Sequence, residues 1–385
     1  MCTALRLVRL FCLSIGSAVL AAAQAPAPKA PQPGPDVITL ASGEKLTGHF
    51  VRSTGSNVTF KSDGLGEVTI DWSKVRSLQT TAKVAVIGKD VKLRKKHLPS
   101  NVPQGTLGMQ EQKMQIAPAP PAAPQSIPVA DASVVIDQDA FQKALMRTPG
   151  ILSDWTGTLT AGATLVHATQ NNQTFTGAAA LVRAEPTEDW LEPGYRTLIN
   201  FSESYGKLTQ PATPTIKTSI YHAGAEQDEY FTMSLFGFGQ GGFDHNYSQG
   251  LDLQQTYAGG IGWTAIKNDA QELDLKGSAS YIRQAFLAGA SGVAPASQSL
   301  VGSVFSEHYQ RKLPRGARLD QTLSVTPAWN NTNAYSAAFG ALMSIPVYKH
   351  LSGSVSLTDT YLNDPPPGFK KNSLQFTLGV TYTLQ

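Results

Sequence analysis

Apolar and polar residues alternate along the C-terminal part of the chain, from Trp155 to the last residue. Successive side chains of a β-strand point to opposite faces, so a period of two predicts strands with one apolar face. The period recurs over residues 251–263, 273–281 and 335–347. It is clearest in the last segment, where one face would carry Leu374, Phe376, Leu378, Val380, Tyr382 and Leu384.

The opposite face of these strands favours a membrane barrel over a soluble sandwich. Its positions hold mostly Ser, Thr, Gly and Gln, whereas exposed strands of soluble proteins favour Lys, Glu and Arg. Connections are long on one side of the region, over residues 207–215, 241–250, 289–299 and 363–372, and tight on the other, with 187–194 as a long exception. Because only a closed sheet pairs every backbone group in lipid, we predict an all-β fold with a C-terminal antiparallel transmembrane β-barrel of about twelve strands.

Large aromatic residues fall near the predicted strand ends, as expected for girdles at the two headgroup levels. The inward set is Tyr195, Tyr230, Trp263 and Tyr382, and the outward set is Tyr205, Trp329, Tyr335 and Tyr361. Two charged residues on the apolar face, Arg183 and Glu203, are also expected near strand ends, where a charge costs less.

The N-terminus has the pattern of a secretory signal peptide over residues 1–23. Arg6 and Arg9 precede an apolar stretch that ends in small residues, which fits a cleavage site. Both cysteines, Cys2 and Cys12, lie in this segment, so the mature chain is expected to have no disulfide and no cysteine-ligated metal. Export without cysteine suits the bacterial envelope, and we expect the protein in the cell outer membrane.

A small β module is predicted between the signal and the barrel. A Pro-rich spacer covers residues 24–36, and short strands are predicted at 37–40, 46–51, 57–61, 67–70, 84–87 and 91–95. Asp71 would cap one helical turn after the fourth strand. This rhythm predicts a periplasmic SH3-like or Sm-like module over 37–116, followed by a Pro/Ala-rich linker over 117–135, a short helix over 136–150 and the barrel over 151–385.

Composition and charge weigh against intrinsic disorder and against nucleic-acid binding. Charged residues make up 15% of the chain and hydrophobic residues 41%, with a formal net charge of +3. That balance, together with 15 Phe, 12 Tyr and 5 Trp, disfavours intrinsic disorder. Loss of Arg6 and Arg9 with the signal would bring the charge near zero, so nucleic acid is not an expected partner.

No pattern of catalytic residues stands out. His167, His222, His245, His308 and His350 fall on separate strands or loops, without a recognisable Ser, Asp or Glu partner in the sequence. The run Asp244–Asn246 cannot aim three consecutive side chains at one ion. We therefore expect no enzyme activity, no cofactor and no metal site.

Two groups of charged residues are the candidates for function. Asp252, Asp274 and Lys276 fall on the polar register and are expected in the barrel lumen, where they would either pair or set the preference of a narrow pore. Lys92, Arg94, Lys95 and Lys96 form the one concentrated basic segment, which is a candidate for binding an anionic cell-wall polymer.

Short motifs give a family resemblance. The segments Gly43–Gly48 and Gly66–Trp72, together with a barrel that opens Trp155-Thr156-Gly157, resemble the uncharacterised salt-induced outer membrane protein family. The resemblance implies an outer-membrane barrel with a periplasmic module, embedded in lipid and inserted by the barrel-assembly machinery, and it implies no catalytic residues. The chain ends Thr383-Leu384-Gln385 rather than in the usual aromatic residue.

These observations lead to one expected function and two alternatives. The leading expectation is a non-enzymatic envelope protein with a structural or narrow-channel role. One alternative is a binding module that holds the barrel to an anionic cell-wall polymer. The other is an outer-membrane hydrolase, which would need a His-Ser or His-Asp pair near the barrel rim.

Overall fold

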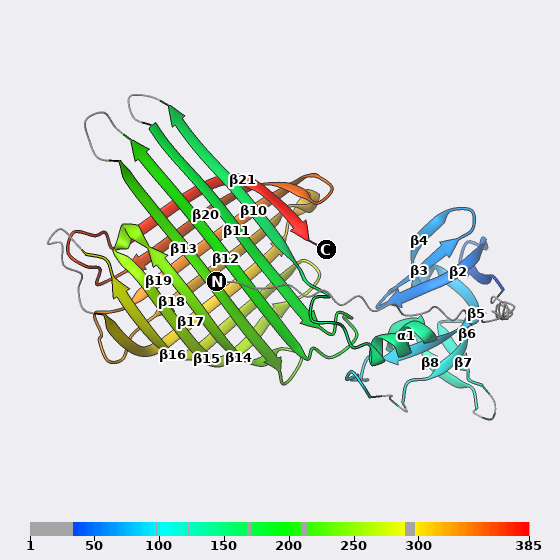
Figure 1. The fold of residues 1–385 in the computed structure, drawn as a ribbon. Helices are drawn as coiled ribbons and strands as arrows, with labels where there is room; N and C mark the ends of the chain where they lie inside the picture. Colours follow the sequence, from blue (N-terminus) through cyan, green and yellow to red (C-terminus); the bar gives the residue numbers. More distant parts are fainter. Residues whose placement is uncertain are drawn as a thin grey trace, which may run out of the picture.

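The computed structural model of the chain contains a small β module and a larger β-barrel (Figure 1). It describes residues 34–97, 99, 101–119, 121, 123–167, 171–209, 215–288 and 297–384. The predicted signal peptide and most of the Pro-rich spacer lie outside the described residues. In the described part of the chain, no helix combines the length and apolar character needed to cross a membrane.

The module is a nine-stranded sheet in which β9 pairs with both β2 and β5. Its strands are β1 (Asp36–Leu40), β2 (Lys45–Thr54), β3 (Asn57–Ser62), β4 (Gly66–Asp71), β5 (Val75–Gly88), β6 (Gln104–Gln110), β7 (Lys113–Ala117), β8 (Gln125–Pro128) and β9 (Ala132–Asp137). The helix α1 (Gln138–Met146) follows, capped by the side chain of Asp137. The helical turn Trp72–Lys74 is capped by Asp71, whose pKa is lowered by hydrogen bonds from Ser73.

Two boundaries predicted within the module are wrong. Residues 125–135, predicted as part of a Pro/Ala-rich linker, form β8 and most of β9, because Ile127, Val134 and Val135 supply apolar side chains to the core of the sheet. Only a short stretch between β7 and β8 keeps the character of a linker. Residues 91–95, predicted as a strand, form none, and Leu93 is instead buried against α1.

The C-terminal region is a closed antiparallel barrel of twelve strands, which confirms the predicted architecture and strand number. The strands are β10 (Thr156–His167), β11 (Asn171–Glu185), β12 (Tyr195–Thr209), β13 (Ile216–Tyr230), β14 (Leu235–Asn246), β15 (Leu251–Lys267), β16 (Gln271–Phe286), β17 (Gln298–Lys312), β18 (Arg318–Thr326), β19 (Ser336–Tyr348), β20 (Leu351–Leu362) and β21 (Asn372–Leu384). The first and last strands pair from Gly157–Leu384 to Gly162–Gly379, so the sheet has no free edge.

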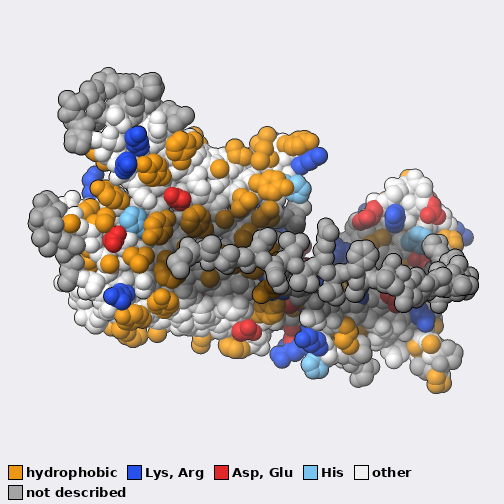
Figure 2. Space-filling model, viewed as in Figure 1, with side chains coloured by type: hydrophobic (Ala, Val, Ile, Leu, Met, Phe, Trp, Pro, Cys, Tyr) orange, Lys and Arg blue, Asp and Glu red, His pale blue; other side chains and the backbone are white. Residues whose placement is uncertain are grey.

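The outer surface of the barrel is apolar. In β21, Leu374, Phe376 and Leu378 are each more than 60% exposed, and the alternate residues face the lumen. Figure 2 shows hydrophobic side chains gathered over the barrel wall on the face in view. A continuous exposed apolar surface of this size is a lipid-facing surface. On β12, Tyr195 and Tyr205 are ten positions apart on this face. In a strand tilted by about 40° this spacing corresponds to a height of about 25 Å, which is that of the apolar band of a membrane barrel.

The long turn between β11 and β12 docks on the module. The ring of Trp190 stacks on Phe141 of α1, with 5.4 Å between ring centroids. Leu191, only 3% exposed, joins the module cluster that contains Phe141 and Leu145. This turn is the one that broke the expected pattern of tight inward turns, and its length is explained by this contact.

Polar contacts reinforce the docking. The backbone N–H of Glu192 donates to the Leu93 carbonyl at 2.9 Å, and its carboxylate accepts from Arg94 Nε at 2.9 Å. Lys95 forms an ion pair with Glu185 at the end of β11. The module therefore lies against the barrel end at which β10 begins and β21 finishes (Figure 1).

The stacked contact predicts that the module detaches more easily when its aromatic partner is removed. Trp190→Ala should expose the connecting segment that follows α1, because about 2–5 kcal/mol of packing is lost when a large buried side chain is truncated. Tryptic cleavage after Arg147, followed with time on the folded full-length protein, measures this exposure.

The matched control is Trp329→Ala. This Trp is 61% exposed and lies at the other end of the barrel, where its backbone N–H donates to the Val301 carbonyl. Cleavage at Arg147 should accelerate in Trp190→Ala alone. Equal cleavage rates in the wild type and Trp190→Ala would show that the turn does not hold the module.

Candidate functional site: the barrel lumen

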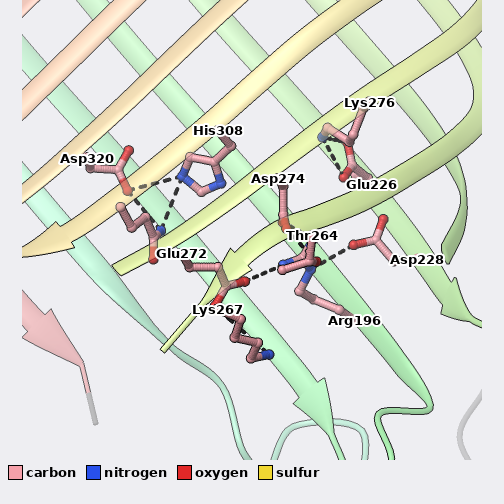
Figure 3. Close-up of polar contacts among 11 residues, drawn as sticks. Arg196, Glu226, Asp228, Thr264, Lys267, Glu272, Asp274, Lys276, His308 and Asp320 are labelled. Atoms are coloured by element: carbon pink, nitrogen blue, oxygen red, sulfur yellow. Dashed lines mark hydrogen bonds and ion pairs between the residues drawn. The ribbon is translucent and has the colours of Figure 1, made fainter. Parts of the chain in front are cut away.

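Charged side chains meet across the barrel lumen near its module end. Arg196 projects from β12, and its guanidinium binds Asp228 Oδ2 at 2.7 Å, Asp274 Oδ2 at 2.7 Å and Glu272 Oε1 at 3.2 Å (Figure 3). Thr264 donates to the other oxygen of Asp274 at 2.6 Å. Because β16, which carries Asp274 and Glu272, lies four strands from β12 in the ring, these contacts cross the lumen and do not merely follow its wall.

Aromatic rings surround this ion-pair cluster. The Arg196 guanidinium lies 5.8 Å from the ring centre of Tyr230 and 5.3 Å from that of Phe236, which is fully buried. Tyr230, predicted in the inward aromatic girdle, shares the lumen-facing register with Asp228, so its assignment to the lipid interface is wrong. The guanidinium lies over the faces of both rings and is 11% exposed.

A second ion pair lies one step further along the same strands. Lys276 Nζ lies 2.7 Å from both carboxylate oxygens of Glu226, joining β16 to β13, and 5.3 Å from the ring centre of Phe238. Both partners are nearly buried, with 13% and 11% of their side chains exposed. The predicted lumen positions of Lys276 and Asp274 are therefore occupied by paired charges.

Two histidines have carboxylate partners that sequence spacing did not reveal. His308 Nε2 lies 3.2 Å from Asp320 Oδ2, and His222 Nδ1 lies 2.6 Å from Asp244 Oδ1. The second nitrogen of His222 contacts the side-chain oxygen of Asn200 at 3.1 Å. These are His-Asp pairs of the kind that the hydrolase alternative requires, and in the described part of the chain neither imidazole is hydrogen-bonded to a Ser, Thr or Tyr hydroxyl.

At the barrel end away from the module, which we call the outer mouth, the lumen is crossed by the connection between β14 and β15. Its helical turn, Tyr247–Gln249, is held by the Asn246 side chain, which accepts from the N–H groups of Ser248 and Gln249. Gln249 Nε2 donates to the Thr360 carbonyl at 2.9 Å and to the Lys371 carbonyl at 2.7 Å. Because β20 and β21 lie opposite β14 and β15 in the twelve-strand ring, this turn bridges the mouth from one side to the other.

The third predicted lumen residue, Asp252, lies apart from the network. A bulge between Leu251 and Leu253 shifts the register at the outer end of β15, and the Asp252 side chain remains 56% exposed. Its carboxylate is 4.0 Å from His245 on the neighbouring strand. Strict alternation places Asp252 in the lumen, and the bulge is the reason that the prediction fails.

The basic segment of the module divides into two parts. Arg94 and Lys95 pair with Glu192 and Glu185 of the barrel, whereas Lys92 and Lys96 are exposed. The cell-wall polymer hypothesis therefore rests on the latter two residues, because the former two serve the docking of the module.

Arg196, Asp228 and Glu226 complete the lumen network and were not predicted from the sequence. A signal for them was present: Arg196 follows the interface residue Tyr195 and so falls on the inward register, and Glu226 and Asp228 alternate in the same way along β13. Their partners on β16 are not encoded by any local spacing.

A closed antiparallel barrel with an apolar outer surface and a polar, ion-paired lumen defines a transmembrane β-barrel protein. The profile of the family described as "Protein of unknown function, DUF481" matches residues 159–384, and the chain belongs to this family. No curated protein matches the sequence.

Three solved structures are similar to this chain over the barrel. The translocator domain of the autotransporter NalP from Neisseria meningitidis shares 12% identity with a TM-score of 0.33, covering 59% of this chain and 87% of that one. The β domain of the Bordetella autotransporter BrkA shares 11% identity with a TM-score of 0.28, covering 60% and 97%. The transport unit of the autotransporter AIDA-I from Escherichia coli shares 10% identity with a TM-score of 0.29, covering 63% and 96%.

The lumen network predicts a large cost for removing its central cation. Arg196→Met leaves the carboxylates of Asp228 and Asp274 buried without a positive partner, and breaking a buried ion pair in this way costs about 3–5 kcal/mol. Denaturant unfolding of the protein in lipid bilayers should therefore show a lower free energy of unfolding.

The exposed Lys370 provides the control, because Lys370→Met removes one charge with no ion pair in the described chain. The triple variant Arg196→Met/Asp228→Asn/Asp274→Asn should recover most of the loss. Unchanged stability of Arg196→Met would mean that the cluster is hydrated and does not bridge the lumen.

Proposed function

We propose that this protein is a non-enzymatic outer-membrane barrel whose lumen is a narrow, cation-preferring channel, closed in this conformation at two levels. The observation that carries the proposal is the ion-paired cluster around Arg196, which crosses the lumen where a structural barrel could be filled with apolar side chains. Burying ions costs several kcal/mol each, and apolar replacements of similar volume are often at least as stable. Charges kept inside a membrane-spanning structure commonly mark an ion pathway.

The charge balance of the network supports a preference for cations. Three cations, Arg196, Lys276 and Lys267, face the four carboxylates of Glu226, Asp228, Glu272 and Asp274, which leaves one net negative charge. Rings of carboxylate groups favour cations in other channels. A rearrangement that frees Arg196 from one carboxylate would widen the constriction and leave it negatively charged.

The turn that closes the outer mouth is held by few enough contacts to open. The turn Tyr247–Gln249 is tied to β20 and β21 mainly by hydrogen bonds from Gln249, Asn246 and Ser248. Each such bond contributes only about 0.5–1.5 kcal/mol net in contact with water. Loss of a few of these bonds would let the turn swing away from the mouth without unfolding a strand.

The outer-membrane location, the periplasmic position of the module and a role in salt adaptation belong to the same proposal. Support for the location comes from the apolar band and from the sequence pattern of a secretory signal. The contact between the module and the turn that joins β11 to β12 supports a fixed position for the module at that end of the barrel. The salt-related role rests on the family resemblance alone.

Planar-bilayer recording of the folded full-length protein tests the channel. The wild type should show rare cation-selective openings, and Gln249→Ala should raise the open probability several-fold, because the outer turn loses two bonds to carbonyl groups. Gln125→Ala, which changes an exposed Gln of the module, should behave as the wild type.

Reversal potentials in a KCl gradient measure the selectivity. Absence of conductance in the folded wild type, Gln249→Ala and Arg196→Gln alike would reject the channel and leave a structural barrel. Anion-selective openings would reject the assigned role of the four lumen carboxylates.

A further inference from the structure

The barrel rim on the module side is divided into an acidic part and a basic part. The turn between β11 and β12 carries Glu188, Asp189 and Glu192 and receives the basic segment of the module. Six strands further around the ring, the turn between β17 and β18 reads Arg-Lys-Leu-Pro-Arg-Gly-Ala-Arg over residues 311–318, with no acidic residue. The two turns lie on opposite sides of the same barrel end.

This second turn and its neighbour form a surface that we call the basic rim. It consists of five exposed cations: Arg311, Lys312, Arg315, Arg318 and Lys349. The two turns are in contact, because a Cβ on Gly316 would lie 3.3 Å from the ring of Pro346 at the end of β19. None of the five side chains makes an ion pair with any residue that the structure describes.

The arrangement of these cations concentrates charge without neutralising it. Lys312 and Arg318 are direct partners across the strand pair, a placement that repels like charges, and they lie at the end of the lumen-facing register of His308 and Asp320. Arg315 at the tip of the turn has a φ of 62°, in the left-handed region that is unfavourable for a side chain of this kind. Asp320, the carboxylate next to Arg318 on the same face of β18, is already paired with His308 and Gln310.

Apolar and aromatic side chains accompany the basic rim on the lipid-facing register. Ile345, Val347 and Tyr348 are 51%, 74% and 64% exposed, and the ammonium of Lys349 lies 5.2 Å from the ring centre of Tyr348. Along the barrel axis, aliphatic side chains are followed by a Tyr ring and then by cations. This order is typical of a membrane interface. A soluble anionic polymer would not bury the exposed side chains of Val347 and Ile345, whereas lipid would.

We propose that the basic rim binds the phosphodiester headgroups of anionic phospholipids in the membrane leaflet on the module side. Arg311, Arg315 and Lys349 then bind lipid phosphates, and Ile345 and Val347 contact the acyl chains of the same lipids. The module cannot neutralise this surface, because it docks half-way around the barrel and presents cations of its own. The proposal rests on the barrel being in a membrane and is independent of whether the lumen conducts.

Native mass spectrometry of the full-length protein, released from micelles doped with phosphatidylglycerol or phosphatidylcholine, tests the proposal. The wild type should retain phosphatidylglycerol in preference to phosphatidylcholine. Arg311→Gln/Arg315→Gln/Lys349→Gln should retain about tenfold less phosphatidylglycerol, since each cation near an anionic surface contributes to the attraction. Heat-modifiable migration on gels confirms that each variant is folded.

The matched control removes three exposed cations from the module, as Arg52→Gln/Lys61→Gln/Lys113→Gln, and should bind lipid as the wild type does. Equal retention of the two lipids by the wild type, or unchanged phosphatidylglycerol binding in the rim variant, would overturn the proposal. So would a rim variant that keeps its lipid but loses binding to purified cell-wall sacculi, because the surface would then serve a polymer. Complete displacement of the lipid by excess inorganic phosphate would reduce the site to one for free phosphate.

Discussion

The pairing of β21 with β10 is the constraint on which the rest of the structure depends. An unpaired backbone group in hydrocarbon costs several kcal/mol, so a sheet in a membrane is stable only when its first and last strands meet. Here they meet over the register from Gly157–Leu384 to Gly162–Gly379, with Gly379 and Gly162 at one end of the pairing. A Cβ on Gly379 would lie 2.5 Å from the Ala161 carbonyl, so the close approach of these strands requires glycine.

Closure determines what the polar face can be. Once the apolar stripe faces lipid, every alternate side chain points into a confined space with little water, and its charges must find partners there. The contacts of Arg196 with Asp228, Glu272 and Asp274, and of Lys276 with Glu226, meet this demand across the lumen. The same closure sets the ring positions by which the acidic docking turn and the basic rim fall on opposite sides of one barrel end.

The fold was largely predictable from the sequence, because alternation is a local property and the strand ends carry turn residues. The strand over residues 372–384, with Leu374 to Leu384 on one face, is a clear case. Predictions failed where a local rule was broken by distant contacts. Residues 125–135 were predicted as a linker but belong to β8 and β9, because β9 pairs with β2 and β5, and Asp252 lies outside the lumen because of a bulge. The partners of Asp274 and Lys276 come from strands four and three places away in the ring, respectively, a relation that no sequence spacing records.

Site-directed spin labelling along β21 tests the central claim most directly. With Cys2 and Cys12 replaced, single cysteines at positions 374–382 would each carry a label in the protein reconstituted in bilayers. Labels at even positions should be accessible to oxygen dissolved in lipid, and labels at odd positions should be shielded from it, because they face the lumen. Equal shielding of even and odd positions from both oxygen and water-soluble reagents would place the apolar stripe in a dry protein interior and contradict the account.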